Sequence, residues 1–134
     1  MTIIEVIKNK KQFLSLLLLA DEQENMIDRY LERGTMYVLN DNGVKAECVV
    51  TDECNGILEI KNIATVPEYQ GKGYAKALID FIVKEYADKY SVLQVGTGDS
   101  PLTVPFYEKC GFVRSHIIPN FFTCLLYTSD AADD

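Results

Sequence analysis

The strongest indication of the fold of this chain is the stretch Ile63-Ala-Thr-Val-Pro-Glu-Tyr-Gln-Gly-Lys-Gly-Tyr-Ala-Lys-Ala-Leu78. It predicts the end of a strand, then a glycine-rich turn, then the start of a helix. Gly71 and Gly73 can adopt positive φ, and small residues let the backbone approach a ligand closely. The first N–H groups of a helix lack intrahelical partners and carry the positive end of its dipole, so such a turn suits a phosphate. The alternative is a turn whose glycines only permit tight packing.

Two common phosphate motifs do not fit this turn. The dinucleotide fingerprint G-x-G-x-x-G needs a third glycine, where this chain has Lys76. A P-loop needs Gly-Lys followed by Ser or Thr, whereas Lys72 is followed by Gly73. A nucleotide-binding domain of either kind is therefore not indicated.

The pattern that does fit is Gln-x-x-Gly-x-Ala, at Gln70, Gly73 and Ala75. It resembles the acyl-CoA pyrophosphate loop of the GCN5-related N-acetyltransferase (GNAT) superfamily, and the preceding Val66-Pro-Glu-Tyr69 resembles that family's lead-in. Further along, Phe106-Tyr-Glu-Lys-Cys-Gly-Phe112 resembles the family's FYEKxGF signature. The two motifs stand in the family's order, and the resemblance extends over most of the chain.

The resemblance implies an α/β (α+β) fold. Its central sheet is mixed and mostly antiparallel, with helices on both faces and a splayed pair of parallel strands at the cofactor site. The residue patterns predict strands at 2–7, 35–39, 44–51, 57–66, 91–96 and 112–118, and helices at 10–20, 21–31, 73–90 and 102–110. Asn42-Gly43 signals a hairpin turn. Strand 91–96 follows a helical crossover, so we expect it to pair parallel to strand 57–66.

We expect one domain over residues 1–123 and an atypical tail over 124–134. A short last strand at 121–127 is one interpretation of the chain end. We favour the other, in which residues from Cys124 onward are a truncation, scar or artefact, because Ser129–Asp134 offers no apolar side chains larger than alanine to pack.

Composition narrows the function classes. A net charge of −7 and a pI near 4.7 argue against nucleic-acid or anionic-membrane partners, and are compatible with an amine substrate. Four cysteines without a Cys-x-x-Cys pair, and one histidine, predict no metal site and reduced thiols in a cytoplasmic protein. The apolar run Leu16–Leu19 is too short to span a bilayer, and Asp21 follows it closely, so we expect neither a membrane segment nor a signal peptide.

The resemblance also implies where acetyl-CoA, the acyl donor, binds. The pantetheine arm would pair with backbone groups of Ile63, Ala64, Thr65 and Val66, and the pyrophosphate would lie on the amides of Gln70, Gly71, Lys72, Gly73, Tyr74 and Ala75. Lys72 could add a point charge or simply be a solvated turn lysine. Ser100 stands where the family often has an asparagine that bonds the cofactor arm, which is a departure from the pattern.

Transfer of an acetyl group to an amine needs a base for the amine and a proton for the departing thiolate. Tyr107 matches the family tyrosine that often protonates this thiolate. A phenol with a pKa of about 10 is close enough to a thiol at about 8.5 for the transfer. Glu59 stands where the histone acetyltransferase branch has its basic glutamate. Its alternative is a solvent-facing strand residue, and ordered water or His116 are other bases. A nucleophilic role for Cys110 has no histidine nearby in sequence to support it.

The sequence therefore predicts an N-acetyltransferase that acts on a primary amine of a small molecule by direct attack, without a covalent enzyme intermediate. The carboxylates Asp21, Glu22, Glu24 and Asp28 either attract this amine or form a solvated helix face. A rival hypothesis is a non-catalytic acyl-CoA-binding sensor or interaction domain. Many relatives dimerise, so a homodimer is a further expectation.

Overall fold

The computed structural model describes residues 1–97, 103–117 and 123–128. The chain forms two compact units. Unit 1 comprises residues 1–51 and 61–81, and unit 2 comprises residues 52–60 and 82–134. The chain passes from one unit to the other at three points, after residues 51, 60 and 81.

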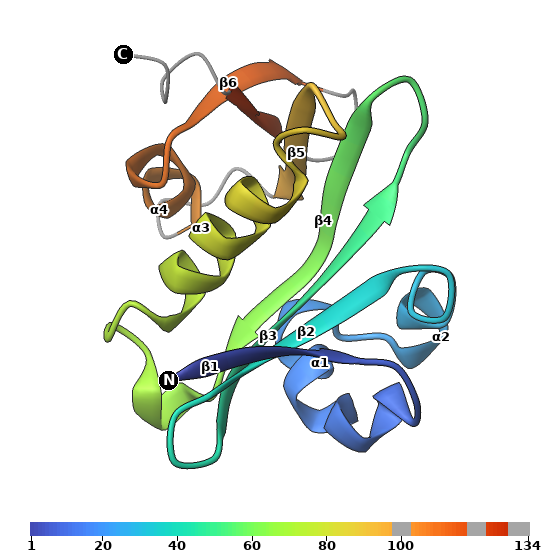
Figure 1. Ribbon diagram of the computed structural model, residues 1–134, viewed down its shortest axis with the longest axis vertical. Coiled ribbons are helices and arrows are strands. Elements are labelled where there is room, and N and C mark those ends of the chain that lie inside the picture. The colour runs from blue at the N-terminus through green and yellow to red at the C-terminus, as the bar shows by residue number, and fades with distance from the viewer. Residues whose placement is uncertain (98–102, 118–122, 129–134) are drawn as a thin grey trace. The chain divides into compact units, whose positions relative to one another are not determined.

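The elements follow one another in a mixed order of strands and helices (Figure 1). The strands are β1 (Thr2–Val6), β2 (Thr35–Asn40), β3 (Val44–Asp52), β4 (Ile57–Thr65), β5 (Val92–Thr97), β6 (Phe112–Ile117) and β7 (Thr123–Thr128). The helices are α1 (Leu14–Ala20), α2 (Glu24–Ile27), α3 (Tyr74–Tyr86) and α4 (Thr103–Lys109), with short 3-10 turns at Lys10–Phe13 and Pro67–Tyr69. Hydrogen-bonded neighbours run in the order β1-β2-β3-β4-β5-β7-β6.

In unit 1 the two faces of the antiparallel strands β2 and β3 are covered by different helices. Register partners share a face, so Met36 lies beside Val49 on one face and Tyr37 beside Cys48 on the other. Met36 and Val49 belong to an apolar cluster with α1, α2 and the segment after α2. On the opposite face, the Tyr37 ring packs edge-on against Phe81 of α3 at 5.0 Å between centroids.

A buried lysine ends the helical segment that contains α2. The Lys10 ammonium donates hydrogen bonds to the carbonyls of Leu31 at 2.9 Å and Gly34 at 2.8 Å, with a longer one to Glu32 at 3.5 Å. Lys10 is only 7% exposed. These carbonyls follow the last helical turn and have no further turn to bond to, so the lysine takes the place of a C-cap.

In unit 2 the parallel pair β4–β5 is followed by two antiparallel pairs. The register of β4 with β5 extends from Ile57↔Val92 to Ile60↔Val95. Strand β7 pairs antiparallel with both β5 and β6, and therefore lies between them. Helix α4 lies next to β6 (Figure 1).

The predicted fold class is confirmed, and so is the parallel pairing of the strand that follows the long helix. Two helix predictions were too long. Helical structure in 21–31 is limited to α2 and turns, since Asp21 is extended and the core needs only Ile27, Tyr30 and Leu31 buried there. Helix α3 ends at Tyr86 rather than at Tyr90, and 87–89 form a turn.

The structure contains a last strand at the chain end. Residues Thr123–Thr128 form β7, which agrees with the expected short strand at 121–127, and the origin of the residues from Cys124 onward stays a prediction. Strand β7 is stabilised by backbone hydrogen bonds to β5 on one side and β6 on the other. Such pairing between distant segments cannot be predicted from the sequence of the segment itself. Residues 129–134 lie outside the described part, and the domain boundary at 123 stays a prediction.

Candidate active site

The glycine turn in unit 1 has the geometry of an anion site. Gly71 and Gly73 hold φ at +81° and +88°, and a Cβ added at either would meet no atom within 4 Å. The glycines are therefore not needed for packing, and the alternative of a tight packing turn is not supported. Ala77 N–H donates to Gly73 O in the first helical turn, so the N–H groups of Tyr74 and Ala75 precede the first intrahelical bond.

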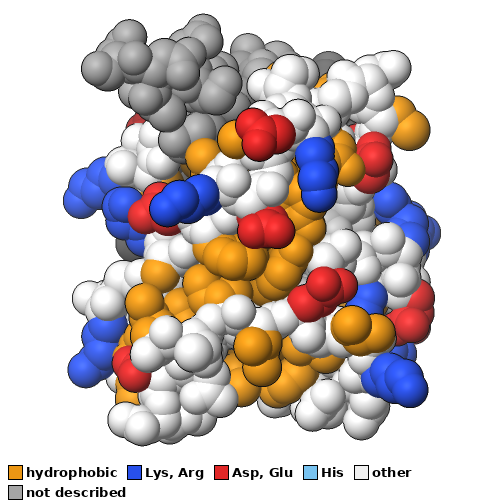
Figure 2. Space-filling model, viewed as in Figure 1, with side chains coloured by type: hydrophobic (Ala, Val, Ile, Leu, Met, Phe, Trp, Pro, Cys, Tyr) orange, Lys and Arg blue, Asp and Glu red, His pale blue; other side chains and the backbone are white. Residues whose placement is uncertain are grey.

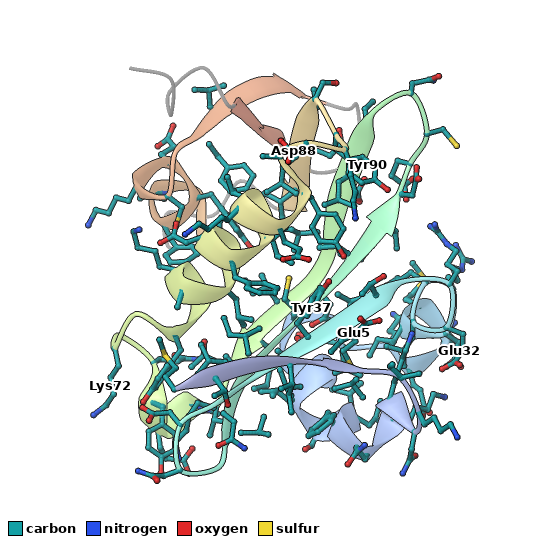
Figure 3. The ribbon with its side chains drawn as sticks, viewed as in Figure 1. Glu5, Glu32, Tyr37, Lys72, Asp88 and Tyr90 are labelled. Atoms are coloured by element: carbon teal, nitrogen blue, oxygen red, sulfur yellow. The ribbon has the colours of Figure 1, made fainter. Side chains whose placement is uncertain are left out.

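Gln70 and Lys72 are two polar side chains of this turn, and they lie differently. Gln70 Nε2 donates to the Thr65 carbonyl at 3.4 Å, which connects the turn back to the end of β4. Lys72 is exposed and extends away from the turn (Figure 3). A contact of Lys72 with the cofactor phosphate stays a prediction, beside the alternative of a solvated turn lysine.

The strand segment predicted to pair with the pantetheine arm is only partly available. Val66 N–H donates to Lys45 O of β3 at 2.8 Å, so this amide is already used. The Thr65 carbonyl accepts a long hydrogen bond from Gln70, at 3.4 Å. Contacts of the cofactor arm with Ile63, Ala64 and Thr65 stay a prediction.

Glu59 lies in unit 2 with an unforeseen partner. The Gln94 Nε2 amide donates to Glu59 Oε1 at 2.6 Å. The two residues are register partners on the parallel strands β4 and β5, and both side chains are half-buried. The predicted base is therefore a strand carboxylate that is held by a neutral amide.

Tyr107 lies on α4, only 7% exposed. Its ring packs edge-on against Phe106 at 5.2 Å and against Phe112 at 5.6 Å between centroids. A tyrosine that serves only in packing would be buried in the same way. The catalytic role of Tyr107 stays a prediction.

The registers of unit 2 place Glu59 and Tyr107 on opposite faces of its sheet. Residues that are register partners across neighbouring strands have side chains on the same face of the sheet. Leu58, Leu93, position 127 of β7 and Phe112 are partners in this sense, and the Tyr107 ring contacts Phe112. Glu59, Gln94 and Val113 each follow one of these residues in the chain, so their side chains are on the opposite face. Tyr107 therefore belongs to the face of Leu58, and Glu59 to the other.

Comparisons with known proteins show the family to which this chain belongs. The model of the acetyltransferase (GNAT) domain matches residues 32–114. The chain belongs to the GNAT acetyltransferase family. An uncharacterized N-acetyltransferase of Bacillus subtilis (strain 168), YvbK, is 34% identical over 114 residues, which cover 83% of this chain and 74% of YvbK.

Solved structures of GNAT proteins agree with this assignment. An IAA acetyltransferase from Bacillus cereus is 31% identical with a TM-score of 0.81, covering 95% of this chain and 99% of its own. A GNAT acetyltransferase from Elizabethkingia anophelis, solved with acetyl-CoA bound, is 26% identical with a TM-score of 0.84 and coverages of 95% and 97%. A Bacillus subtilis acetyltransferase solved with CoA is 27% identical with a TM-score of 0.81 and coverages of 94% and 97%.

The β2–β3 hairpin supports the glycine turn of this GNAT domain, and sequence analysis missed it. The Tyr74 hydroxyl donates to Asp41 at 2.7 Å, which raises the pKa of the tyrosine, and the Lys45 ammonium lies 4.0 Å from the centre of the Tyr69 ring. These contacts connect residues far apart in sequence. The Asn42-Gly43 signal predicted the turn itself but not what it touches.

Other predicted residues lie away from these contacts. Ser100 is outside the described residues, and the structure describes the backbone of His116 only. Glu24 and Asp28 both pair with Lys11, at 2.7 and 2.6 Å, and Asp21 accepts a hydrogen bond from Tyr30. Those three carboxylates therefore have local partners, which favours the alternative of a structured helix face over an amine site.

An apolar pocket in unit 2 contains none of the predicted site residues. It lies at the C-terminal end of α3, and Leu58, Ile82, Tyr86, Tyr90 and Leu93 are among its lining residues. Over the described ranges we find no group of His, Cys, Asp and Glu arranged to hold a metal ion. The same ranges contain no helix of the length and apolarity needed to cross a membrane. Acidic and basic side chains are interspersed on the face in Figure 2.

Proposed function

We propose that this GNAT protein transfers the acetyl group of acetyl-CoA to a primary amine of a small molecule by direct attack. The glycine turn carries this proposal, because Gly71 and Gly73 combine positive φ with open space at the start of a 13-residue helix. Relatives solved with acetyl-CoA and with CoA support the choice of donor. The net charge of −7 is compatible with a cationic acceptor.

In the proposed reaction, the amine nitrogen bonds to the acetyl carbonyl carbon and the carbon–sulfur bond breaks. Glu59 takes the proton that the amine loses, and Tyr107 gives its phenolic proton to the departing thiolate. Acceptor and leaving group then have separate proton partners, and the transfer needs no covalent enzyme intermediate. Cys110 has no nucleophilic role in this proposal.

The first test is a calorimetric titration of the chain with acetyl-CoA. We expect micromolar binding, followed by release of CoA thiol when a panel of primary amines is added (a diamine, an amino sugar and an arylalkylamine). A folded sample that does not bind acetyl-CoA would contradict the proposal. Binding without turnover of any amine would favour the rival, a non-catalytic acyl-CoA-binding sensor or interaction domain.

Two further expectations accompany the proposal. Cys48, Cys54 and Cys110 are free thiols in the structure, which is consistent with action in the cytoplasm. A homodimer also stays an expectation, and sedimentation at micromolar concentration would test it.

A further inference from the structure

We infer that Gln94 is a positioning residue, which holds the Glu59 carboxylate in place. This inference rests on the proposed function, in which Glu59 is the base. The Gln94 Nε2 to Glu59 Oε1 distance of 2.6 Å is short for an amide donor, as expected when the acceptor is a carboxylate. Sequence analysis gave Gln94 no role.

The strand register makes this contact a fixed one. Glu59 and Gln94 are paired residues on adjacent parallel strands, so both side chains leave the sheet on the same face. Their chain neighbours Leu58 and Leu93 are 3% and 7% exposed on the other face, which anchors both backbones. A glutamate side chain has three rotatable bonds, and a base must stay within hydrogen-bond reach of the proton that it takes. The amide limits that freedom.

An amide is also a suitable partner for a base because it does not titrate. A lysine at position 94 would form an ion pair, which would lower the basicity of the carboxylate much further, and a histidine would change charge with pH. Glutamine donates the same hydrogen bond throughout the working range of pH.

Gln94→Met tests the inference, because methionine has nearly the same shape and no donor. We expect turnover about tenfold lower, which corresponds to one hydrogen bond to a charged group, with unchanged affinity for acetyl-CoA. The control Gln12→Met replaces an exposed glutamine of unit 1 and should match the wild type.

Two further variants separate this inference from the proposed function. Glu59→Gln should abolish most turnover, and the double variant Glu59→Gln/Gln94→Met should be no slower than Glu59→Gln alone, because Gln94 acts through Glu59. Wild-type turnover in Glu59→Gln would refute the proposed base. A large loss in Glu59→Gln combined with a wild-type rate in Gln94→Met would overturn the positioning role only.

A second variant keeps the test valid if Gln94→Met folds poorly. Gln94→Asn keeps the amide but is too short to reach Glu59, so it should show the same loss of turnover with unchanged affinity for acetyl-CoA. A wild-type rate in a folded Gln94→Asn variant would overturn the inference.

Discussion

Gly73 holds φ at +88° with no neighbour within 4 Å of an added Cβ. Gly73→Asp should abolish acetyl-CoA binding in calorimetry, because it places a carboxylate at the proposed pyrophosphate position as well as straining the backbone. Gly73→Ala is the matched control. It adds only the strain of a left-handed residue, about 1–2 kcal/mol, and should keep measurable binding. Equal affinity of Gly73→Asp and the wild type would contradict the assignment of this turn.

Tyr107 tests whether a buried phenol takes part in the chemistry. Tyr107→Phe keeps the ring contacts with Phe106 and Phe112, so folding and acetyl-CoA affinity should change little. Turnover should fall by about tenfold to a hundredfold if the hydroxyl protonates the thiolate. The control Tyr90→Phe removes a hydroxyl that bonds Asp52 in the same unit and should leave turnover unchanged. If the two variants behave alike, Tyr107 is structural.

At the scale of elements, Lys10 caps the segment after α2 by donating hydrogen bonds to the carbonyls of Leu31 and Gly34. Lys10→Met keeps the side chain's length and leaves the carbonyls of Leu31 and Gly34 without their donor. We expect a loss of about 1–3 kcal/mol in the free energy of unfolding, measured with urea. Lys11→Met is the matched control, since the neighbouring Lys11 is exposed and pairs only at the surface, where little is gained. Equal stability of the two variants would show that Lys10 is not a cap.

The same elements show what the sequence could and could not predict. Turn residues placed β2, β3 and β4 closely, because Asn42-Gly43 is a local signal. Gln70, Gly73 and Ala75 predicted the turn for the same reason. Burial alternates along β4, whereas four successive residues of β2 are buried. The pairs Glu59–Gln94 and Tyr74–Asp41 join residues on different elements, so only the register shows them. The end of the turns that follow α2, at Leu31 to Gly34, depends on Lys10, which lies far away in sequence.

At the scale of the whole molecule, burial of the Glu47 carboxyl group in unit 1 opposes folding. Glu47 is fully buried on the face of β3 that meets the apolar cluster, and its two oxygens have no hydrogen-bond partner among the described residues. Nearby, Asn62 donates to the carbonyl of Leu17 and to the hydroxyl of Tyr30, whose pKa burial raises to about 12. Burial likewise raises the pKa of Glu47 well above its ordinary value, which favours the neutral acid.

This burial makes the stability of the chain depend on pH. Below the ordinary value of 4.5, Glu47 is protonated in both the folded and the unfolded state. As the pH rises above 4.5, the unfolded chain releases this proton and the folded chain keeps it. The free energy of unfolding should then fall by about 1.4 kcal/mol per pH unit, until the raised pKa of the folded state is passed.

Glu47→Gln tests this dependence, because it removes the titrating proton and keeps the size of the side chain. Urea unfolding between pH 5 and neutrality should show a flatter profile for Glu47→Gln than for the wild type, and greater stability at the upper end of that range. Glu5→Gln, at an exposed carboxylate on β1 (Figure 3), is the control and should keep the wild-type slope. A wild-type slope in Glu47→Gln would assign the pH dependence to other groups, and the buried acid would then already be paired in solution.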